Sequence, residues 1–400
     1  MKKLLAALLL LAALLAPLGA PAADYYVYFG THNSGPTRGF SLAHFNSDTG
    51  NLTTPQFLLP AVGPGFFMIH PDGLHLYACN TFGAKIAGNV SAYALDPKTG
   101  NLTFLNSQPS GGPDPSYISF DKTGRYALVA NYNGANVAVF PILADGSLGN
   151  RTGFDQHTGK GTDPKRQTQP YAHSIIVDPS NHFALNPDLG LDKVFIYKFD
   201  ATTGNLTPND PPFAATKPGT GPRHIIFAPN EKYAYLISEM GSIVTQFAWD
   251  AAKGTLKELQ TISTLPPDFK GTNVDAEIAL SPDGKFLYAS DRGLDALTTF
   301  SVDPADGHLT CLDYTPTQGK TPRNFALDPT GKWIIASNQD SNTVLVLRRD
   351  EKTGKLSPAG PLIPLDYPFC ERFLLIPADA ASNGTPPATS KVPASTTPTK

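Results

Sequence analysis

PRHIIFAPNEKYAYLISEMGSIVTQFAWDAAKGTLK, residues Pro222 to Lys257, contains short runs of β-branched and aromatic residues. The runs are HIIFA, YAYLIS and SIVTQFAWD, and a fourth, TLKELQTI, continues just past the segment. The turn-forming sequences PNEK, EMG and DAAKG separate them. Runs of this length between Pro, Gly, Asn and Asp clusters are typical of antiparallel strands joined by tight turns. The segment therefore predicts one four-stranded antiparallel meander.

The same unit recurs along the chain at a spacing of about 50 residues, which is the spacing of propeller blades. The other copies begin at Tyr25, Phe66, Pro115, Ala172, Asp275 and Pro322. One four-stranded sheet cannot bury both of its faces, whereas seven sheets packed radially can, and their edges stay short. The sequence therefore predicts an all-β fold, a seven-bladed β-propeller of four-stranded antiparallel blades that spans residues 23–377 as one domain.

The first copy, YYVYFGTHN followed by FSLAHFNSDTGNLT, has no PDG-type turn of its own. The strand-like sequence RFLLIP at Arg372 to Pro377 is a candidate for its missing strand. We expect this C-terminal strand to close the ring beside the N-terminal strand.

The two ends of the chain differ in composition from the repeats. Residues 1–22 carry Lys2 and Lys3, a run of Leu and Ala, and a final Ala20-Pro21-Ala22, which together predict a cleaved secretory signal peptide and a periplasmic or secreted protein. Residues 378–400 are rich in Pro, Thr, Ala and Ser and predict a disordered tail. The formal net charge of −3 gives no electrostatic footprint for nucleic acid. After signal cleavage we expect a monomer that does not associate with membranes.

Several common site motifs are absent from the sequence. Cys79, Cys311 and Cys370 are an odd number of cysteines that fall in distant copies, so we expect no structural disulfide. CxxC and HxH pairs are absent, and so is GxSxG, which argues against a zinc site and a serine-hydrolase elbow. The sequence therefore implies no metal and no organic cofactor. One irregular insert, residues 150–171, joins two copies, and such inserts are often functional.

Charged and polar residues gather at one end of the predicted blades. The start of strand one and the end of strand two lie side by side in a meander, so these positions from all blades should converge on the mouth of the central channel. The candidates at these positions are His173, Asp188, Arg223, His224, Glu239, Glu277, Arg292, Arg323 and Asn338. The opposite end carries ordinary turn sequences such as PDG, KTG and PTG. Some polar residues at this end have a purely structural interpretation. Asn131, Asp192 and Asp340 are expected to cap turns, and Arg223 with Glu239 could equally be a structural ion pair.

Four consecutive copies resemble the lactonase family of seven-bladed propellers. The similarity is carried by AHSIIVDP with PDLGLDKVFIY, GPRHIIFAPNEKYAYLISEMGSIV, AEIALSPDGKFLYASDRG and TPRNFALDPTGKWIIASNQDS. The family contains propeller-type 6-phosphogluconolactonases and carboxymuconate-lactonizing enzymes. The resemblance implies an active site at the channel mouth on His173, Arg223, Glu239 and Arg292. It also implies a small-molecule lactone or sugar acid as ligand. Tyr171 stands where some relatives have His.

These residue types suit lactone hydrolysis, which needs a base for water and a cation for the oxyanion. Arg223 and Arg292 are the candidate oxyanion ligands, and His173 is the candidate base because an unperturbed imidazole titrates near neutrality. We expect Arg223 to lower the pKa of Glu239, which leaves Glu239 to orient the base or the water. His224, Glu277, Arg323, Asn338 and Asp188 are the candidate substrate-binding residues. Two alternatives remain open: a lactonizing cycloisomerase that uses the same residues, and a non-catalytic binding propeller.

Overall fold

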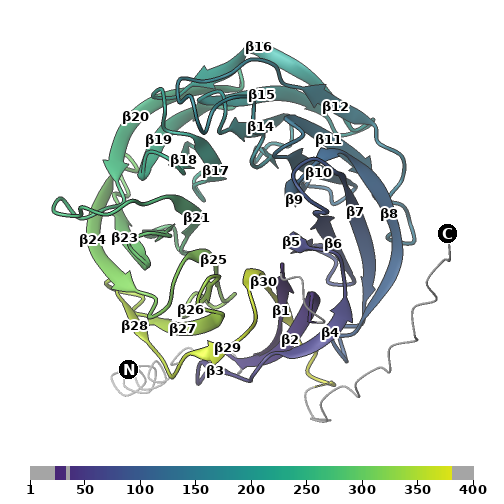
Figure 1. The fold of residues 1–400 in the computed structure, drawn as a ribbon, viewed down its shortest axis with the longest axis vertical. Coiled ribbons are helices and arrows are strands. Elements are labelled where there is room, and N and C mark those ends of the chain that lie inside the picture. Colours follow the sequence, from purple (N-terminus) through teal and green to yellow (C-terminus); the bar gives the residue numbers. More distant parts are fainter. Residues whose placement is uncertain (1–22, 33–36, 381–400) are drawn as a thin grey trace, which may run out of the picture.

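The protein is described here by a computed structural model of residues 23–32 and 37–380, and it is an all-β ring of seven antiparallel sheets (Figure 1). The predicted fold class is confirmed. Figure 1 shows β5, β9, β17, β21, β25 and β30 nearest the centre of the ring and β8, β16, β20 and β24 on its circumference. The described residues contain no helix that is long and apolar enough to cross a membrane. The predicted signal peptide lies outside the described residues.

The first blade combines both ends of the propeller. It contains β30 (Pro368–Leu375), β1 (Asp24–Thr31), β2 (Gly39–Asn46), β3 (Asn51–Leu52) and β4 (Gln56–Pro60). The second contains β5 (Pro64–Ile69), β6 (His75–Asn80), β7 (Ala87–Leu95) and β8 (Leu102–Pro113), and the third contains β9 (Pro115–Phe120), β10 (Tyr126–Asn131), β11 (Asn136–Pro141) and β12 (Gly153–Gln156). The fourth contains β13 (Ile176–Val177), β14 (Phe183–Asp188), β15 (Lys193–Asp200) and β16 (Asn205–Ala215).

The remaining three blades follow the same order. The fifth contains β17 (Pro222–Phe227), β18 (Tyr233–Ser238), β19 (Ile243–Asp250) and β20 (Thr255–Ser263). The sixth contains β21 (Asp275–Leu280), β22 (Phe286–Asp291), β23 (Ala296–Val302) and β24 (Leu309–Pro316). The seventh contains β25 (Pro322–Leu327), β26 (Trp333–Asn338), β27 (Thr343–Arg349), β28 (Leu356–Pro358) and β29 (Ile363–Pro364). The quoted segment, with its continuation to Ser263, is thus one complete blade, and each strand lies within one or two residues of its predicted bounds.

The ring closes as the sequence predicts. β30 pairs antiparallel with β1, in a register that joins Tyr25 to Leu375 and Tyr28 to Arg372. On the next interface the indole Nε1 of Trp333 in β26 donates a hydrogen bond of 2.7 Å to the carbonyl of Ser47. The strand from the C-terminal end therefore supplies the innermost position of the first blade and holds the two ends of the ring together.

Two details differ from the sequence prediction. Part of the predicted insert is regular structure, because Gly153–Gln156 forms β12, the outer strand of the third blade. The inner strand of the fourth blade is reduced to Ile176–Val177. Its partner β14 contains Pro187, which has no N–H for the ladder, and the side-chain amide of Asn186 instead donates to the carbonyl of Ser174.

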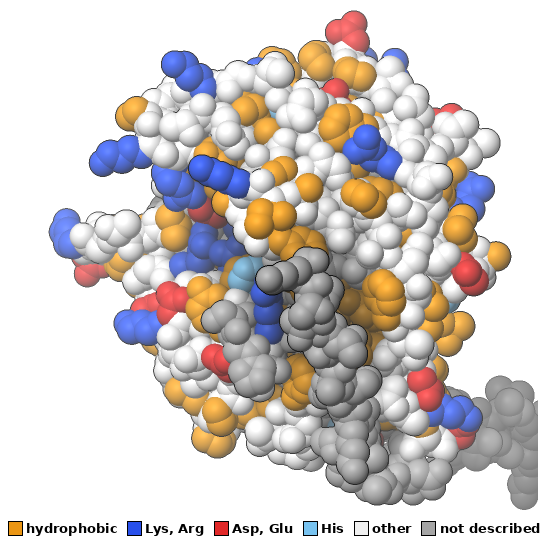
Figure 2. Space-filling view, turned by 45° about the vertical axis from the view of Figure 1, so that its right-hand side comes forward, with side chains coloured by type: hydrophobic (Ala, Val, Ile, Leu, Met, Phe, Trp, Pro, Cys, Tyr) orange, Lys and Arg blue, Asp and Glu red, His pale blue; other side chains and the backbone are white. Residues whose placement is uncertain are grey.

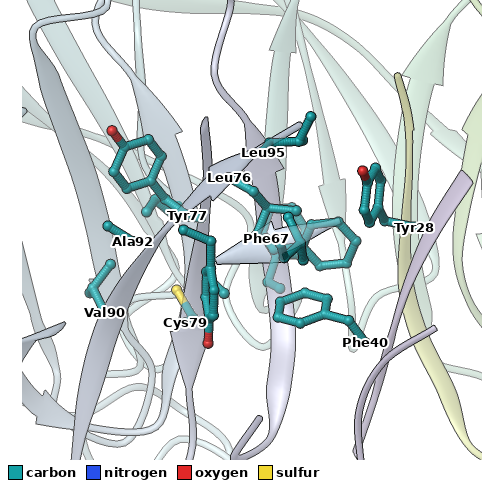
Figure 3. Close-up of a cluster of buried hydrophobic side chains, with 14 of the residues drawn as sticks. Tyr28, Phe40, Phe67, Leu76, Tyr77, Cys79, Val90, Ala92 and Leu95 are labelled. Atoms are coloured by element: carbon teal, nitrogen blue, oxygen red, sulfur yellow. The ribbon is translucent and has the colours of Figure 1, made fainter. Parts of the chain in front are cut away.

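The core lies between neighbouring blades and is built from large side chains of the first and second strands. Figure 3 shows one such cluster, in which Phe67 of the second blade lies beside Tyr28 and Phe40 of the first blade, while Tyr77 points away from them and packs on Phe120 of the third blade. A buried tyrosine recurs at several interfaces, and its hydroxyl donates to a glycine carbonyl in a turn of the next blade. These pairs are Tyr28–Gly100 (2.8 Å), Tyr77–Gly146 (2.7 Å), Tyr235–Gly307 (2.7 Å) and Tyr288–Gly354 (2.9 Å). The repeat therefore satisfies the polar end of each buried ring while burying the rest.

We expect Phe67→Ala to lower the free energy of unfolding by about 3–5 kcal/mol, because it removes a fully buried ring and leaves a cavity. Phe104→Ala is the matched control, since Phe104 is 54% exposed. Urea unfolding of both variants measures the difference, and equal losses would contradict the placement of the core.

Cys79 and Cys370 are buried in the same core cluster, and both are free thiols. The expectation that the cysteines lie in distant parts of the ring is therefore wrong for this pair, because β30 brings Cys370 next to the second blade. Cys311 is also free. The described chain continues three residues past the predicted domain end at residue 377, where Asp379 pairs with Lys98 at 2.7 Å. The rest of the predicted tail, residues 381–400, lies outside the described residues.

Candidate active site

A repeated irregularity places side chains at one end of the inner strands. β5, β9, β17 and β25 each carry one extra residue near their first position, opposite a regular partner strand. The extra residues are Gly65, Ser116, Arg223 and Arg323. β21 also has one extra residue, because Ala276 and Glu277 lie opposite the single residue Ser290. Such bulges re-aim side chains away from the sheet, and Gly65, Ser116, Arg223 and Arg323 all line one pocket.

The pocket has a volume of about 500 Å³ and is polar and cationic. In addition to the bulge residues, the pocket is lined by the residue that directly follows the second strand in five blades. These residues are Thr81, Tyr132, Glu239, Arg292 and Gln339. His173, His224, His32, Tyr367 and Phe369 complete much of the wall. Figure 2 shows Lys, Arg and His side chains gathered in a recess of one face of the molecule. The predicted convergence of strand starts and strand ends is therefore present.

Glu239 forms ion pairs with three arginines. Its Oε2 lies 2.8 Å from Arg292 Nη2 and 3.2 Å from Arg223 Nε, and its Oε1 lies 2.6 Å from Arg166 Nη2. Burial alone would raise the pKa of Glu239, but the guanidinium groups of Arg292, Arg223 and Arg166 outweigh it and hold the pKa at about 2. The predicted direction of this shift is confirmed. Glu239 is therefore a permanent carboxylate that fixes two arginines on the pocket wall.

The two arginines keep unused donors. Arg223 Nη1 donates to the carbonyl of Ala276 at 2.5 Å, and Arg292 Nη2 donates to the carbonyl of Asp275 at 2.9 Å. Arg223 Nη2 and Arg292 Nη1 have no hydrogen-bond acceptor among the described residues. The guanidinium planes are thus anchored on one side and have donors left for a ligand.

His173 is a buried, neutral imidazole beside Glu239. Its Nε2 lies 3.7 Å from Glu239 Oε2, and its Nδ1 has no hydrogen-bond partner in the described part of the chain. The ring of Tyr132 packs edge-on against it, with centroids 5.2 Å apart. Burial, with the charges of Arg223 and other pocket cations, lowers the pKa of His173 well below 6.5. The expectation of a pKa near neutrality is therefore wrong, because sequence alone does not show that the ring is buried among cations.

His224 and Glu277 form a layer next to the pocket. His224 Nδ1 lies 2.9 Å from Glu277 Oε1, and the amide of Asn324 donates to Glu277 Oε2. His224 lines the pocket, whereas Glu277 does not. Burial raises the pKa of Glu277, but His224 and nearby arginines outweigh it and bring it to about 2. Glu277 therefore orients His224 and does not face the pocket itself.

Arg323 lines the pocket and, unlike Arg223 and Arg292, pairs with no carboxylate among the described residues. Its guanidinium lies 4.1 Å above the centroid of the Phe369 ring. It has no hydrogen bond or ion pair with any residue in the described ranges, 23–32 and 37–380. Burial, with the charges of Arg292 and Arg223, lowers its pKa to about 9. A buried cation held next to two others favours an anion in the pocket.

Besides Glu277, two more of the candidates lie outside the pocket wall. Asp188 accepts hydrogen bonds from the backbone N–H groups of Tyr171 and Gly190 and lies 2.6 Å from His157 Nδ1. Asn338 donates to the carbonyl of Thr317 at 3.0 Å. Both are the last residue of a second strand; Gln339, which follows Asn338, lines the pocket, whereas Leu189, which follows Asp188, does not. We therefore leave Asp188 and Asn338 out of the proposal below.

Arg166 and Tyr132 were not among the expected site residues: Tyr132 lines the pocket, whereas Arg166 does not line it but pairs with a residue that does. Arg166 belongs to the predicted insert and pairs with Glu239, and Tyr132 packs on both Tyr171 and His173. The available signal was the length of the insert together with its cluster of basic residues. The insert thus reaches the pocket residue Glu239 through Arg166, and the bond between His157 and Asp188 ties the insert to β14.

Acid should destabilise the protein through Glu239. Its pKa is about 2 when folded and 4.5 ordinarily, so the stability it contributes is present above pH 4.5 and is lost as the pH falls toward 2. The shift corresponds to about 3 kcal/mol. We expect Glu239→Gln to show a shallower loss of the urea midpoint between pH 5 and pH 3 than the wild type. The exposed Glu258→Gln should behave as the wild type, and parallel curves for all three proteins would contradict this role.

The fold and the pocket define a seven-bladed β-propeller with an arginine-rich polar site at one end of its inner strands. The family model for the lactonase, 7-bladed beta-propeller family matches residues 26–373. A 6-phosphogluconolactonase of Bacillus subtilis is 34% identical over 350 residues, which cover 88% of this chain and 98% of the relative. A 6-phosphogluconolactonase of Serratia proteamaculans is 36% identical over 314 residues, covering 78% and 88%.

A solved structure agrees with the relatives. The structure of a periplasmic gluconolactonase of Pseudomonas aeruginosa is 32% identical, with a TM-score of 0.83 and coverage of 89% of this chain and 100% of that one. The chain therefore belongs to the lactonase family of seven-bladed β-propellers, as the sequence motifs indicated.

Proposed function

We propose that the protein hydrolyses the lactone of a sugar acid in the pocket around Glu239, with His173 as base and Arg223 and Arg292 as oxyanion ligands. The observation that carries the proposal is the fixation of two arginines by one permanent carboxylate, beside a neutral buried imidazole. The names of the relatives, 6-phosphogluconolactonase and gluconolactonase, support the same reaction class.

The reaction needs few parts. A water molecule beside His173 attacks the lactone carbonyl carbon, and the imidazole takes its proton as the new C–O bond forms. The carbonyl oxygen becomes an oxyanion, which accepts hydrogen bonds from the free guanidinium nitrogens of Arg223 and Arg292. The ring C–O bond then breaks, and the imidazole returns the proton to the leaving hydroxyl. The product acid ionises and releases one proton to solvent.

The low pKa of His173 fits this sequence. A neutral imidazole is ready to accept a proton, and a bound anion offsets the arginine charges that oppose protonation. Glu239 does not take the proton, because its pKa of about 2 makes it a very weak base. It holds the arginines in position and lies close enough to His173 to stabilise the imidazolium that forms transiently. Arg323 binds the carboxylate of the product or a further anionic group of the substrate.

We also propose that the protein acts outside the cytoplasm on an unphosphorylated aldonolactone, as a monomer. The sequence of residues 1–22 favours export, and one similar structure is of a periplasmic gluconolactonase. Phosphorylated sugar lactones are intracellular metabolites, so an exported enzyme would meet the unphosphorylated form.

Proton release in weak buffer tests both parts of the proposal. The purified protein without residues 1–22 is mixed with δ-gluconolactone or with its 6-phospho form, and each rate is compared with spontaneous hydrolysis. We expect a larger kcat/KM for the unphosphorylated lactone. A preference for the 6-phospho form would support the proposed reaction but contradict the proposal that the substrate is unphosphorylated. Rates equal to the spontaneous ones with both lactones would overturn the function.

A further inference from the structure

The turn between β5 and β6, His70-Pro71-Asp72-Gly73-Leu74-His75, lies at the end of the inner strand away from the pocket. His70 Nδ1 lies 2.9 Å from Asp72 Oδ2, and His75 Nδ1 lies 2.8 Å from the same oxygen. The three atoms lie within 4.8 Å of one another. Two imidazole nitrogens and a carboxylate oxygen, all on one six-residue turn, are thus aimed at a common point.

The corresponding turns of the third, fourth, sixth and seventh blades are built differently. Their first residue is Asp121, Asp178, Ser281 or Asp328, and its side chain accepts the backbone N–H of the residue five positions later. That later residue is always a large aromatic: Tyr126, Phe183, Phe286 or Trp333. In the second blade both positions are histidines. Since Asp or Ser followed by an aromatic residue builds the same turn in four blades, the turn itself does not require His70 and His75.

The proton on His70 is assigned by its surroundings. Its Nε2 lies 2.8 Å from the carbonyl oxygen of Gly124, which can only accept, so Nε2 carries the hydrogen. In the neutral ring, Nδ1 therefore presents its lone pair, and it accepts the N–H of Asp72 at 3.3 Å. That lone pair also faces the Asp72 carboxylate oxygen at 2.9 Å. Two lone pairs at this distance repel each other unless a proton or a metal cation lies between them.

The hydrogen bond from His70 Nε2 to the carbonyl of Gly124 is of the kind that usually supports a metal-bound histidine. A metal-ligating imidazole donates its other N–H to a carbonyl or carboxylate, which fixes the ring and its tautomer. The ring of His75 is also held, because it packs directly on Gly146, where an added Cβ would lie 2.0 Å from its Nε2. Asp72 Oδ1 accepts the N–H of Leu74 at 2.7 Å, so the turn fixes one oxygen and leaves Oδ2 for a ligand.

We propose that His70 Nδ1, Asp72 Oδ2 and His75 Nδ1 bind a divalent first-row transition ion, with Zn²⁺ as the best match to two imidazoles and a carboxylate. Ligand atoms about 2.1 Å from a tetrahedral zinc ion lie roughly 3.3 Å apart, so the contacts open by a few tenths of an ångström on binding. Asp72 is exposed, and both rings are half-buried, so solvent has access to the remaining coordination positions. The spacing His-x-Asp-x-x-His differs from CxxC and HxH, and a search for those pairs misses it.

The site is structural and separate from the pocket. Gly65 and Phe66 line the pocket at the start of β5, and His70 follows the end of this strand. Five residues of extended chain span roughly 16 Å, so the ion does not reach the reacting groups. It ties the turn of the second blade to Gly124 of the third, and this inference does not depend on the proposed lactonase activity.

Zinc competition against a chromophoric chelator tests the site in tag-free, metal-stripped protein without residues 1–22. His75→Gln removes one ligand, and Asp72→Asn keeps the shape of its side chain but removes the charge. His308→Gln is the matched control, because His308 Nδ1 lies 3.0 Å from Asp306 in a pair with no third ligand. We expect one zinc ion per chain in the wild type and in His308→Gln, and at least a tenfold weaker affinity in the other two variants.

A second readout separates binding from folding. Zinc should raise the Tm of the wild type and of His308→Gln but leave His75→Gln unchanged, since an ion that binds only the folded state stabilises it. The circular dichroism of the metal-free variants shows whether each has folded. Equal zinc affinity in the wild type and His75→Gln, or no wild-type binding at micromolar zinc, would overturn the proposal. An equal loss of affinity in His308→Gln would reduce the binding to unspecific surface histidines.

Discussion

Arg292→Ala is expected to lower kcat for the lactone by about 10²–10³, the usual loss when one oxyanion donor is removed. Arg292 Nη2 is held by Glu239 and by the carbonyl of Asp275, and its Nη1 has no acceptor among the described residues. The variant removes the free donor while Arg223 and Arg166 still neutralise Glu239. The effect should therefore fall on kcat rather than on the free energy of unfolding.

Two companion variants sharpen this test. Arg292→Lys keeps the charge but not the fork of donors, so we expect an intermediate kcat. Arg348→Ala removes an exposed arginine of β27 and should leave the kinetics unchanged. A kcat for Arg292→Ala within threefold of the wild type would exclude Arg292 from the stabilisation of the oxyanion.

His173→Ala is expected to lower kcat by about 10²–10⁴, the usual contribution of a positioned general base. The pH profile should also differ from that of an ordinary histidine base. Because the pKa of His173 lies well below 6.5, the base stays deprotonated as the pH falls, and kcat/KM of the wild type should not decline between pH 7 and pH 6. An acid limb centred near pH 6.5 would contradict the buried, cation-flanked environment of the ring.

The control for this variant is His182→Ala, because His182 is exposed and outside the pocket. Both variants should retain the wild-type Tm within a few degrees. Full activity in His173→Ala would transfer the role of base to another group, with His224 next in line on the pocket wall.

The sequence predicts the propeller well because each blade repeats a local pattern. Runs such as YAYLIS coincide with β18, and the closing strand was visible as RFLLIP, most of which lies in β30. The short β13 was not predictable from composition, since its pairing is lost where Pro187 has no N–H to donate. The strand β12 was hidden in the insert because GFDQ carries no strong strand signal.

Of the candidate site residues, some line the pocket and others lie beside it. Asp188 and Asn338 end their strands and bond to backbone groups, whereas Glu239 and Arg292, one position beyond the strand end, reach the pocket. Alternation along a strand does not show where the chain leaves the sheet, so this offset needs coordinates. The bulge that projects Arg223 is also invisible in the sequence, because the extra residue is defined only by its pairing across the sheet.

The double variant His173→Ala/Arg292→Ala tests the central claim most directly, because it removes the proposed base and one oxyanion donor from a single pocket. The measurement is kcat/KM for δ-gluconolactone by proton release, with the Tm as a check on folding. The proposal predicts a folded protein whose rate is close to spontaneous hydrolysis, with a loss smaller than the product of the two single losses. A folded double variant that keeps more than a tenth of the wild-type kcat/KM would show that the reaction takes place elsewhere on the propeller.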